Sequence, residues 1–147
     1  MPDRPPPRIT IAEFERLARD KLPLVEQYGI RAERIEAGRV VMRMPCGDGV
    51  LRPGGTVNGP AMVALADVAM YVLVLSLIGP AELAVTTSLT ANFLRRPKPA
   101  DLLAEARVLK LGARLVVGEV SLFTEGESEP VTHVTATYSI PPRGAEP

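Results

Sequence analysis

The sequence has little of several residue types that decide function: its 147 residues include one cysteine, one histidine and no tryptophan. The lone cysteine, Cys46, cannot form an internal disulfide, and the chain opens on a proline-rich stretch rather than the apolar segment of a secretory signal, so we expect a cytoplasmic protein. The lone histidine, His133, excludes a histidine-rich zinc site. We therefore expect no metal, and we expect His133 to be an ordinary strand residue rather than the base of a catalytic triad.

An excess of charge of either sign is also absent. Seventeen Lys and Arg residues balance seventeen Asp and Glu residues, so no overall field attracts nucleic acid or an anionic membrane surface. Gly54-Gly55 lacks the Lys-Ser/Thr that a Walker-type phosphate loop requires. A hydrophobic content of 46% suits one compact domain with a real core. We predict that this domain spans residues 9–141, between a flexible segment at 1–8 and a flexible tail at 142–147.

One long apolar run is present, at residues 60–78, and Asp67 is its only charged residue. These nineteen residues approach the length of a membrane span. A central Asp is costly in a bilayer, and no Lys or Arg lies within or directly beside the run to set an orientation. A helix that is apolar on every side is otherwise one surrounded by protein. We therefore expect a helix buried in a domain or dimer core, and no membrane partner.

Asp67 is the best clue to function within that run. Removing a neutral polar group from water without a hydrogen bond costs roughly 2 to 7 kcal/mol. An ionised carboxylate costs at least several kcal/mol unless it is paired or hydrogen-bonded. A carboxylate among Ala, Met, Val and Leu therefore either has structural partners or belongs to a functional site. The glycine-rich turn at residues 52–59, which leads directly into the helix, favours the functional interpretation.

The remaining elements follow from capping and periodicity. Thr10 with Glu13 three residues later is a capping-box pattern, which predicts a short amphipathic helix ending near Pro23. Residues 30–35 and 39–44 have the composition of a β-hairpin. Gly79-Pro80 predicts the end of the long helix, because Gly accepts a left-handed cap and Pro cannot continue a helix.

The second half of the chain has a strand pattern throughout. Residues 85–93 alternate strictly, which predicts Leu89 on one face with Thr87, and Thr86 on the other face. Further strands are predicted at 102–109, 114–124 and 130–140. A hairpin, a long buried helix and sequential strands predict an α+β fold with an antiparallel sheet around one central helix. One sheet leaves a stripe of that helix uncovered, so we expect at least a dimer.

Three segments carry a resemblance to a known family. They are the loop 52–60 leading to Asp67, the strand end Asn-Phe-Leu-Arg-Arg-Pro at 92–97, and Ala-Asp-Leu-Leu-Ala-Glu-Ala at 100–106. On these residues the chain resembles a hotdog-fold thioesterase of the phenylacetic-acid-degradation and 4-hydroxybenzoyl-CoA thioesterase group. The resemblance implies an antiparallel sheet wrapped around a long central helix. It also implies a homodimer, or a homotetramer made of two hotdog dimers.

The same resemblance implies roles for individual residues. In that family a His-Gly-Gly motif stands nine positions before the catalytic Asp or Glu, and here Asn58, Gly59 and Pro60 occupy those three places before Asp67. The implied role of Asp67 is a general base or a nucleophile toward an acyl-CoA thioester, in a site shared between two subunits. Thr86 aligns with a Ser or Thr that helps to hold the catalytic water in some relatives. Thr is also common in strands, so an ordinary structural role is the alternative.

The chemistry of the loop residues agrees with those roles. A thioester carbonyl gains negative charge on attack, and the free N–H groups at a helix N-terminus stabilise such charge. Gly59 has such an N–H and Pro60 does not, so Gly59 is the candidate for the oxyanion hole. Asn58 can form hydrogen bonds but cannot titrate near neutrality, so acid–base chemistry would depend on Asp67.

Coenzyme A would need cationic groups for its phosphates. Arg95, Arg96 and Lys98 form the densest basic cluster, although a strand end exposed to solvent is an equally ordinary explanation. Arg52 occupies a place where related sequences often carry Gln or Asn near the substrate carbonyl. It could pair with Asp67 or with an anionic substrate group. Apolar residues of the central helix are candidates for an acyl pocket or for the core, namely Met62, Met70, Tyr71 and Leu73.

Two other functions remain open. Asn58 and Arg52, which differ from the usual residues of the family, motivate a non-catalytic protein that binds or senses acyl-CoA without hydrolysing it. A hydratase or dehydratase acting on enoyl or 3-hydroxyacyl thioesters shares the fold but pairs an active-site His with an Asp or Glu. The chain has no His near the glycine-rich loop, which favours thioester hydrolysis. The acyl-CoA itself supplies the only cofactor-like group that we expect.

Overall fold

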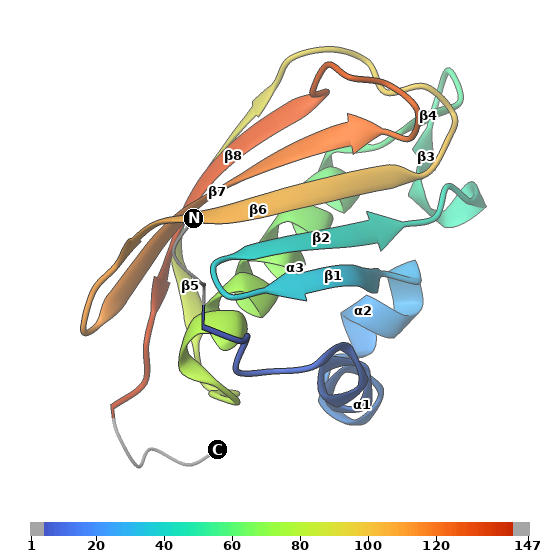
Figure 1. The fold of residues 1–147 in the computed structure, drawn as a ribbon. Helices are drawn as coiled ribbons and strands as arrows, with labels where there is room; N and C mark the ends of the chain where they lie inside the picture. The colour runs from blue at the N-terminus through green and yellow to red at the C-terminus, as the bar shows by residue number, and fades with distance from the viewer. Residues whose placement is uncertain (1–4, 143–147) are drawn as a thin grey trace.

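The structure is a computed structural model that describes residues 5–142, and the expected flexible residues 1–4 and 143–147 lie outside this range. A long helix runs across one face of an antiparallel sheet, and two short helices lie at the β1 edge (Figure 1). This is the α+β arrangement expected from the sequence. The elements in chain order are α1 (Ile11–Lys21), α2 (Pro23–Tyr28), β1 (Arg31–Glu36), β2 (Arg39–Met44), a 3-10 turn (Asp48–Val50), β3 (Leu51–Arg52), β4 (Thr56–Val57), α3 (Gly59–Ile78), β5 (Val85–Phe93), β6 (Leu102–Leu111), β7 (Leu115–Thr124) and β8 (Thr132–Ser139).

The six strands of the main sheet lie in the order β1-β2-β6-β7-β8-β5, and every neighbouring pair is antiparallel. The predicted hairpin is β1–β2. Strands β6, β7 and β8 follow one another directly, as their short turns require. Strand β5 follows α3 in the chain but lies at the far edge beside β8, so one of its edges has no partner among the described residues. The short strands β3 and β4 form a separate ribbon in the loop before α3.

The N-terminal helices partly follow the expectation. The capping box of α1 is present, because Thr10 Oγ1 accepts from the Glu13 N–H and Glu13 Oε1 accepts from the Thr10 N–H, both at 3.1 Å. Helix α1 ends at Lys21, close to the predicted end. The second helix, α2, was not predicted. Pro23 ends one helix but also starts the next, since Pro is well suited to the first helical turn.

Helix α3 is the core of the molecule rather than a membrane span. With 20 residues and a mean hydropathy of 2.3, the helix is long and apolar enough to cross a membrane. However, 61% of its apolar segment is buried inside this single chain. The helix starts with Asn58 as N-cap and ends at Gly79, whose φ is 87°. Methionine and aliphatic side chains from α3 pack against inward-facing residues of β2, β6, β7 and β8. The apolar sequence of α3 is therefore explained by burial against the sheet.

One stripe of α3 stays partly open in the single chain. Val63, Ala64, Asp67, Val68 and Tyr71 are only half-buried, and their spacing of three and four residues places them on one face of the helix. This is the uncovered stripe that the all-round apolar sequence predicted. Asp67 lies in the middle of it. The carboxylate is therefore accessible from outside the domain.

The strict alternation predicted for residues 85–93 is wrong at one point. The pairing of β5 with β8 shifts between Thr86 and Ser88, which leaves Thr87 as an extra residue in a β-bulge. Thr86 pairs with Tyr138, and Leu89 pairs with Ala136, which lies two residues away on the same face of β8. Thr86 and Leu89 therefore share the inward face. The bulge turns Thr86 toward α3, whereas strict alternation would turn it away.

Close packing of β7 on α3 depends on a glycine. A Cβ placed on Gly118 would lie 2.7 Å from Sδ of Met70 and 2.9 Å from Cδ2 of Leu73. We expect Gly118→Ala to lower the free energy of unfolding by about 1–3 kcal/mol, as overpacking of a core does. Urea unfolding followed by circular dichroism measures this change.

The matched control is Gly47→Ala. Gly47 has an extended backbone with φ of −157°, and a Cβ added there would meet nothing within 4 Å. The free energy of unfolding of Gly47→Ala should therefore stay within about 0.5 kcal/mol of the parent value. Equal midpoints for the two variants would show that Met70 and Leu73 can move aside without cost.

Candidate active site

Two hydroxyl groups hold the Asp67 carboxylate. Thr86 Oγ1 donates to Asp67 Oδ1 at 2.6 Å, and the Tyr138 hydroxyl donates to the same oxygen at 2.8 Å. The Tyr138 hydroxyl also lies 2.9 Å from the Asp67 backbone carbonyl. The carboxylate is thus oriented by two neutral donors. Thr86 was a predicted site residue, whereas Tyr138 was not.

Burial keeps the Tyr138 phenol in its donor form. The side chain is 2% exposed. Burial raises the pKa of Tyr138 well above its ordinary value, and the nearby Asp67 carboxylate raises it further. A phenol that stays protonated over the whole physiological range always has a proton to donate to Asp67. The Tyr71 ring lies beside it, with ring centroids 6.4 Å apart.

Asp67 lies in the wall of a cavity of about 490 Å³, which we call the carboxylate cavity. Much of its wall is apolar, and its polar groups are the Asp67 cluster and a Lys21–Glu82 ion pair of 2.7 Å. Tyr71 is part of the wall, whereas Met70 and Leu73 are fully buried core residues. The lining consists of residues 21–25, Asp67, Val68, Tyr71, Glu82, Ala84, Val85, Thr86 and Tyr138.

A second pocket, of about 420 Å³, lies at the N-terminus of α3, and we call it the arginine pocket. It brings together four of the residues singled out in the sequence: Gly59, Arg52, Arg95 and Arg96. Lys98 is not part of its lining. The full lining is Arg52, Thr56, Val57, Gly59, Met62 and residues 93–97.

Gly59 carries the free backbone donor at the start of α3. Asn58 Oδ1 accepts from the Ala61 N–H at 2.8 Å, the Met62 N–H donates to the Asn58 carbonyl, and Pro60 has no N–H. Within residues 5–142 the Gly59 N–H has no acceptor. Asn58 is therefore used as a helix cap, which leaves Gly59 as the donor that can meet a ligand at the positive end of the helix.

The four basic residues differ in how free they are. Arg95 donates to the Pro130 carbonyl and lies 3.6 Å from Glu129, while Lys98 forms an ion pair with Glu127. Arg52 and Arg96 form no ion pair with any residue in the described part of the chain. Two cations without a carboxylate partner in that part of the chain therefore line the same pocket as Gly59. Such cations suit an anionic ligand.

The predicted site residues thus form two groups rather than one. Gly59 and Asp67 are eight residues apart in α3, which is about 12 Å along the helix axis. Arg52 lies in the group with Gly59, and within the single chain it does not pair with Asp67, whose carboxylate binds the two hydroxyls. Each group opens into its own pocket. One chain therefore carries two separate groups of candidate site residues.

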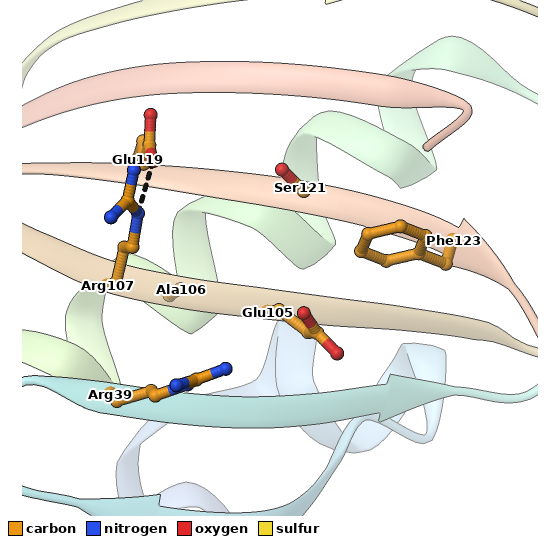
Figure 2. A pocket seen from close by; sticks show the side chains of 7 residues that line it. All are labelled: Arg39, Glu105, Ala106, Arg107, Glu119, Ser121 and Phe123. Atoms are coloured by element: carbon orange, nitrogen blue, oxygen red, sulfur yellow. Dashed lines mark hydrogen bonds and ion pairs between the residues drawn. The ribbon is translucent and has the colours of Figure 1, made fainter. Parts of the chain in front are cut away.

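A third pocket, of about 320 Å³, contains none of the predicted site residues. Figure 2 shows its side chains on strands β2, β6 and β7, with α3 behind the sheet. Its charges are largely compensated, because Arg107 forms an ion pair with Glu119. His133 lies 3.1 Å from the same Glu119. His133 is therefore a strand residue on the sheet face turned away from Asp67.

A metal site has no support in the geometry. Within residues 5–142, no three side chains among His, Cys, Asp and Glu gather closely enough to hold a metal ion. The described groups with reactive or donor atoms at the two pockets include Asp67, the two hydroxyls that hold it and the Gly59 N–H.

The fold defines a class: a hotdog-fold protein, in which an antiparallel sheet packs around one long central helix. The chain belongs to the thioesterase superfamily, because the sequence profile of that family matches residues 54–131, from the glycine-rich loop to the residue before β8. This confirms the resemblance seen in the sequence. Membership supports hydrolysis of a thioester.

Known proteins are similar to this chain over most of its length. A crystal structure of a candidate thioesterase from Silicibacter sp. TM1040 has 42% sequence identity and a TM-score of 0.84, covering 92% of this chain and 94% of that one. The phenylacetic acid degradation protein PaaI from Thermus thermophilus, solved as a mutant, has 25% identity and a TM-score of 0.72, covering 81% and 99%. A candidate esterase of Saccharolobus solfataricus is 26% identical over 134 residues, which are 91% of this chain and 87% of that protein.

Proposed function

We propose that the protein is an acyl-CoA thioesterase in which Asp67 of one chain and Gly59 of a second chain act on the same thioester. The observation that carries this proposal is the presence of two complementary half-sites on each chain. The carboxylate cavity has the base but not the N-terminus of α3, and the arginine pocket has the Gly59 donor at that N-terminus but no carboxylate among its described lining residues. Each half supplies what the other lacks.

Distance argues against a site within one chain. The attacking group and the oxyanion donor must both lie about 3 Å from the reacting carbonyl. Gly59 and Asp67 lie about 12 Å apart along one rigid helix, so one chain cannot bring them to the same carbonyl. A second copy removes this conflict if it places its own Gly59 beside Asp67 of the first.

The free edge of β5 supports such a pairing. Val85 and Phe93, at the two ends of β5, are 55% and 53% exposed in the single chain. Val85 lines the carboxylate cavity, and Phe93 lines the arginine pocket. If two β5 strands pair antiparallel about Leu89, Val85 of one chain lies opposite Phe93 of the other. The two kinds of half-site then meet twice in one dimer, and pairing also covers an exposed sheet edge.

The two pockets suit the two ends of an acyl-CoA. The carboxylate cavity has an apolar wall and a volume within the usual range for small-molecule sites, so we assign the acyl group to it. Arg52 and Arg96 in the arginine pocket suit phosphates of coenzyme A. The CoA enters as part of the substrate, and the proposed reaction needs no other cofactor. A cytoplasmic location, where such a substrate would be met, belongs to the same proposal.

The proposed chemistry is addition of water to the thioester. In the base mechanism, Asp67 takes a proton from water as the water oxygen bonds to the carbonyl carbon, and the carbonyl oxygen becomes an oxyanion that accepts from the Gly59 N–H. The carbon–sulfur bond then breaks, and the thiolate leaves and takes up the proton. If Asp67 is instead the nucleophile, its oxygen bonds to the carbonyl carbon, the carbon–sulfur bond breaks and the CoA thiolate leaves and takes up a proton. Water then cleaves the resulting anhydride, which releases the free acid and restores the Asp67 carboxylate. Both routes need the ionised carboxylate.

A panel of acyl-CoA substrates tests this function. Purified protein is incubated with short-chain, medium-chain and aryl acyl-CoAs, free thiol is followed with a thiol reagent, and an enoyl-CoA is included. Catalytic thiol release is the expected result. Tight binding without turnover would instead favour an acyl-CoA sensor. Hydration of the enoyl-CoA without thiol release would favour a hydratase, although His133 lies on the wrong face of the sheet for that reaction.

A further inference from the structure

The two oxygens of the Asp67 carboxylate have different surroundings. Both hydroxyl donors, from Thr86 at 2.6 Å and from Tyr138 at 2.8 Å, reach Oδ1. Within residues 5–142 no donor reaches Oδ2. An oxygen that accepts two hydrogen bonds is a poorer proton acceptor than one that accepts none. The carboxylate therefore has one anchored oxygen and one free oxygen.

We propose that Tyr138 is a positioning residue, which together with Thr86 anchors Oδ1 of Asp67 and makes Oδ2 the oxygen that reacts. This inference rests on the proposed thioesterase function. Tyr138 itself does not contact the reacting atoms. It acts through Asp67, by fixing the rotation of the carboxylate.

The sheet is built to present both donors together. Thr86 and Tyr138 are directly opposite each other in the β5–β8 pairing, so their side chains lie on the same face. The β-bulge at Thr87 is what turns Thr86 to that face. Tyr138 is almost fully buried, and its hydroxyl lies 2.9 Å from the Asp67 backbone carbonyl as well as 2.8 Å from Oδ1, so the phenol is held close against Asp67.

Tyr138→Phe tests the proposal because it removes one hydroxyl and keeps the ring. We expect kcat for thiol release to fall about ten- to hundredfold, the scale of a hydrogen bond to a charged group. KM should change less than about twofold, because Tyr138 does not hold the substrate. The readout is the split between the two constants: loss of positioning lowers kcat and leaves KM, whereas a damaged cavity wall raises KM.

Matched variants separate this effect from general damage. Tyr28→Phe removes a phenol hydroxyl outside both pockets and should leave kcat and KM unchanged. Tyr71→Phe removes a hydroxyl from the same cavity that donates to the Glu82 carbonyl rather than to Asp67, so its effect should be confined to KM. The proposal is wrong if Tyr138→Phe keeps the parent kcat, or if it raises KM alone.

Thr86 gives a second test that does not depend on the core. Thr86→Val removes the other donor to Oδ1 and should lower kcat, and Thr86→Ser should retain it. Thr135→Val should be neutral, because Thr135 is exposed on the outward face of β8 and outside both pockets. Equal rates for Thr86→Val and Thr135→Val would overturn the anchoring of Oδ1. Thiol release by the parent protein is measured alongside. Its absence would refute the thioesterase function itself rather than the role of Tyr138.

Discussion

Asp67→Asn is expected to lower kcat for acyl-CoA hydrolysis about a thousandfold, which lies within the usual contribution of a general base. The variant is sharper than Asp67→Ala, because the amide oxygen can take the place of Oδ1 and still accept from Thr86 and Tyr138. Only the free Oδ2 is replaced, by an NH₂ group that cannot accept a proton. The lost group acts in the transition state, so kcat and kcat/KM should fall together. Steady-state thiol release on the best substrate of the panel measures both.

Asp20→Asn is the matched control for that experiment. Asp20 lies on α1 outside both the carboxylate cavity and the arginine pocket, and its rate should equal that of the parent. Circular dichroism should show unchanged folding for both variants. If Asp67→Asn kept more than about a tenth of the parent kcat, a fall far smaller than general bases contribute, Asp67 would be a structural residue and the proposed mechanism would be wrong.

Gly59→Pro is expected to lower kcat about a hundredfold, as loss of one oxyanion-hole donor does. The substitution removes the free N–H. Residue 59 also precedes Pro60, which disfavours a helical backbone for any residue with a Cβ, and Gly59→Ala carries the same cost. Proline is favoured at the first helical position, and Asn58 before it has φ of −76° and ψ of 156°, an extended conformation that a residue preceding proline adopts readily. Single-turnover thiol release measures the loss at the chemical step.

Gly59→Ala controls for the added carbon. It keeps the N–H, and its Cβ would lie 3.5 Å from Cζ of Phe93, which is ordinary van der Waals contact. The ratio of the two rates therefore isolates the donor, and the account requires the Pro variant to be at least about tenfold slower than the Ala variant. Similar rates for both would remove Gly59 from the oxyanion hole.

Much of the fold could be predicted because local chemistry and packing agree in this chain. Three local patterns each predict one structure. The capping box at Thr10 starts a helix, Gly79 ends one, and the regular spacing of the later apolar runs predicts strands. Helix α2 escaped prediction because Pro23 can end one helix and begin another. Residues 21–25, between and within these helices, line the carboxylate cavity. Their part in the site depends on how the helices pack, which no local pattern reveals.

The site was harder to predict than the fold for two physical reasons. Tyr138 contacts Asp67 from 71 residues away, and nothing local to β8 marks it apart from a period that places it inward. The bulge at Thr87 breaks the period of two without a glycine or proline to signal it, so Thr86 was predicted on the wrong face. The sequence identified both the loop before α3 and Asp67. In the fold, Arg52 and Gly59 line the arginine pocket, whereas Asp67 lines the carboxylate cavity. A sequence cannot show that separation, because it depends on distance along a folded helix.

Asn58 illustrates how one residue can be explained by structure alone. The sequence suggested a catalytic role at the position of the family histidine. In the structure its side-chain oxygen caps α3 through the Ala61 N–H at 2.8 Å. Capping by Asn stabilises a helix by about 1 kcal/mol and also fixes the direction of the neighbouring Gly59 N–H. A contribution of Asn58 to catalysis would therefore come through the helix start that presents Gly59.

The central claim is that each active site combines Asp67 of one chain with Gly59 of another, and a mixed dimer tests it most directly. The Asp67→Asn and Gly59→Pro chains are coexpressed with different affinity tags, and the heterodimer is isolated by two successive affinity steps. One of its two composite sites then has both changes, and the other has none. We predict about half of the parent activity per dimer, although each variant alone is nearly inactive. A heterodimer as inactive as its two parents would show that the site lies within a single chain and would contradict the account.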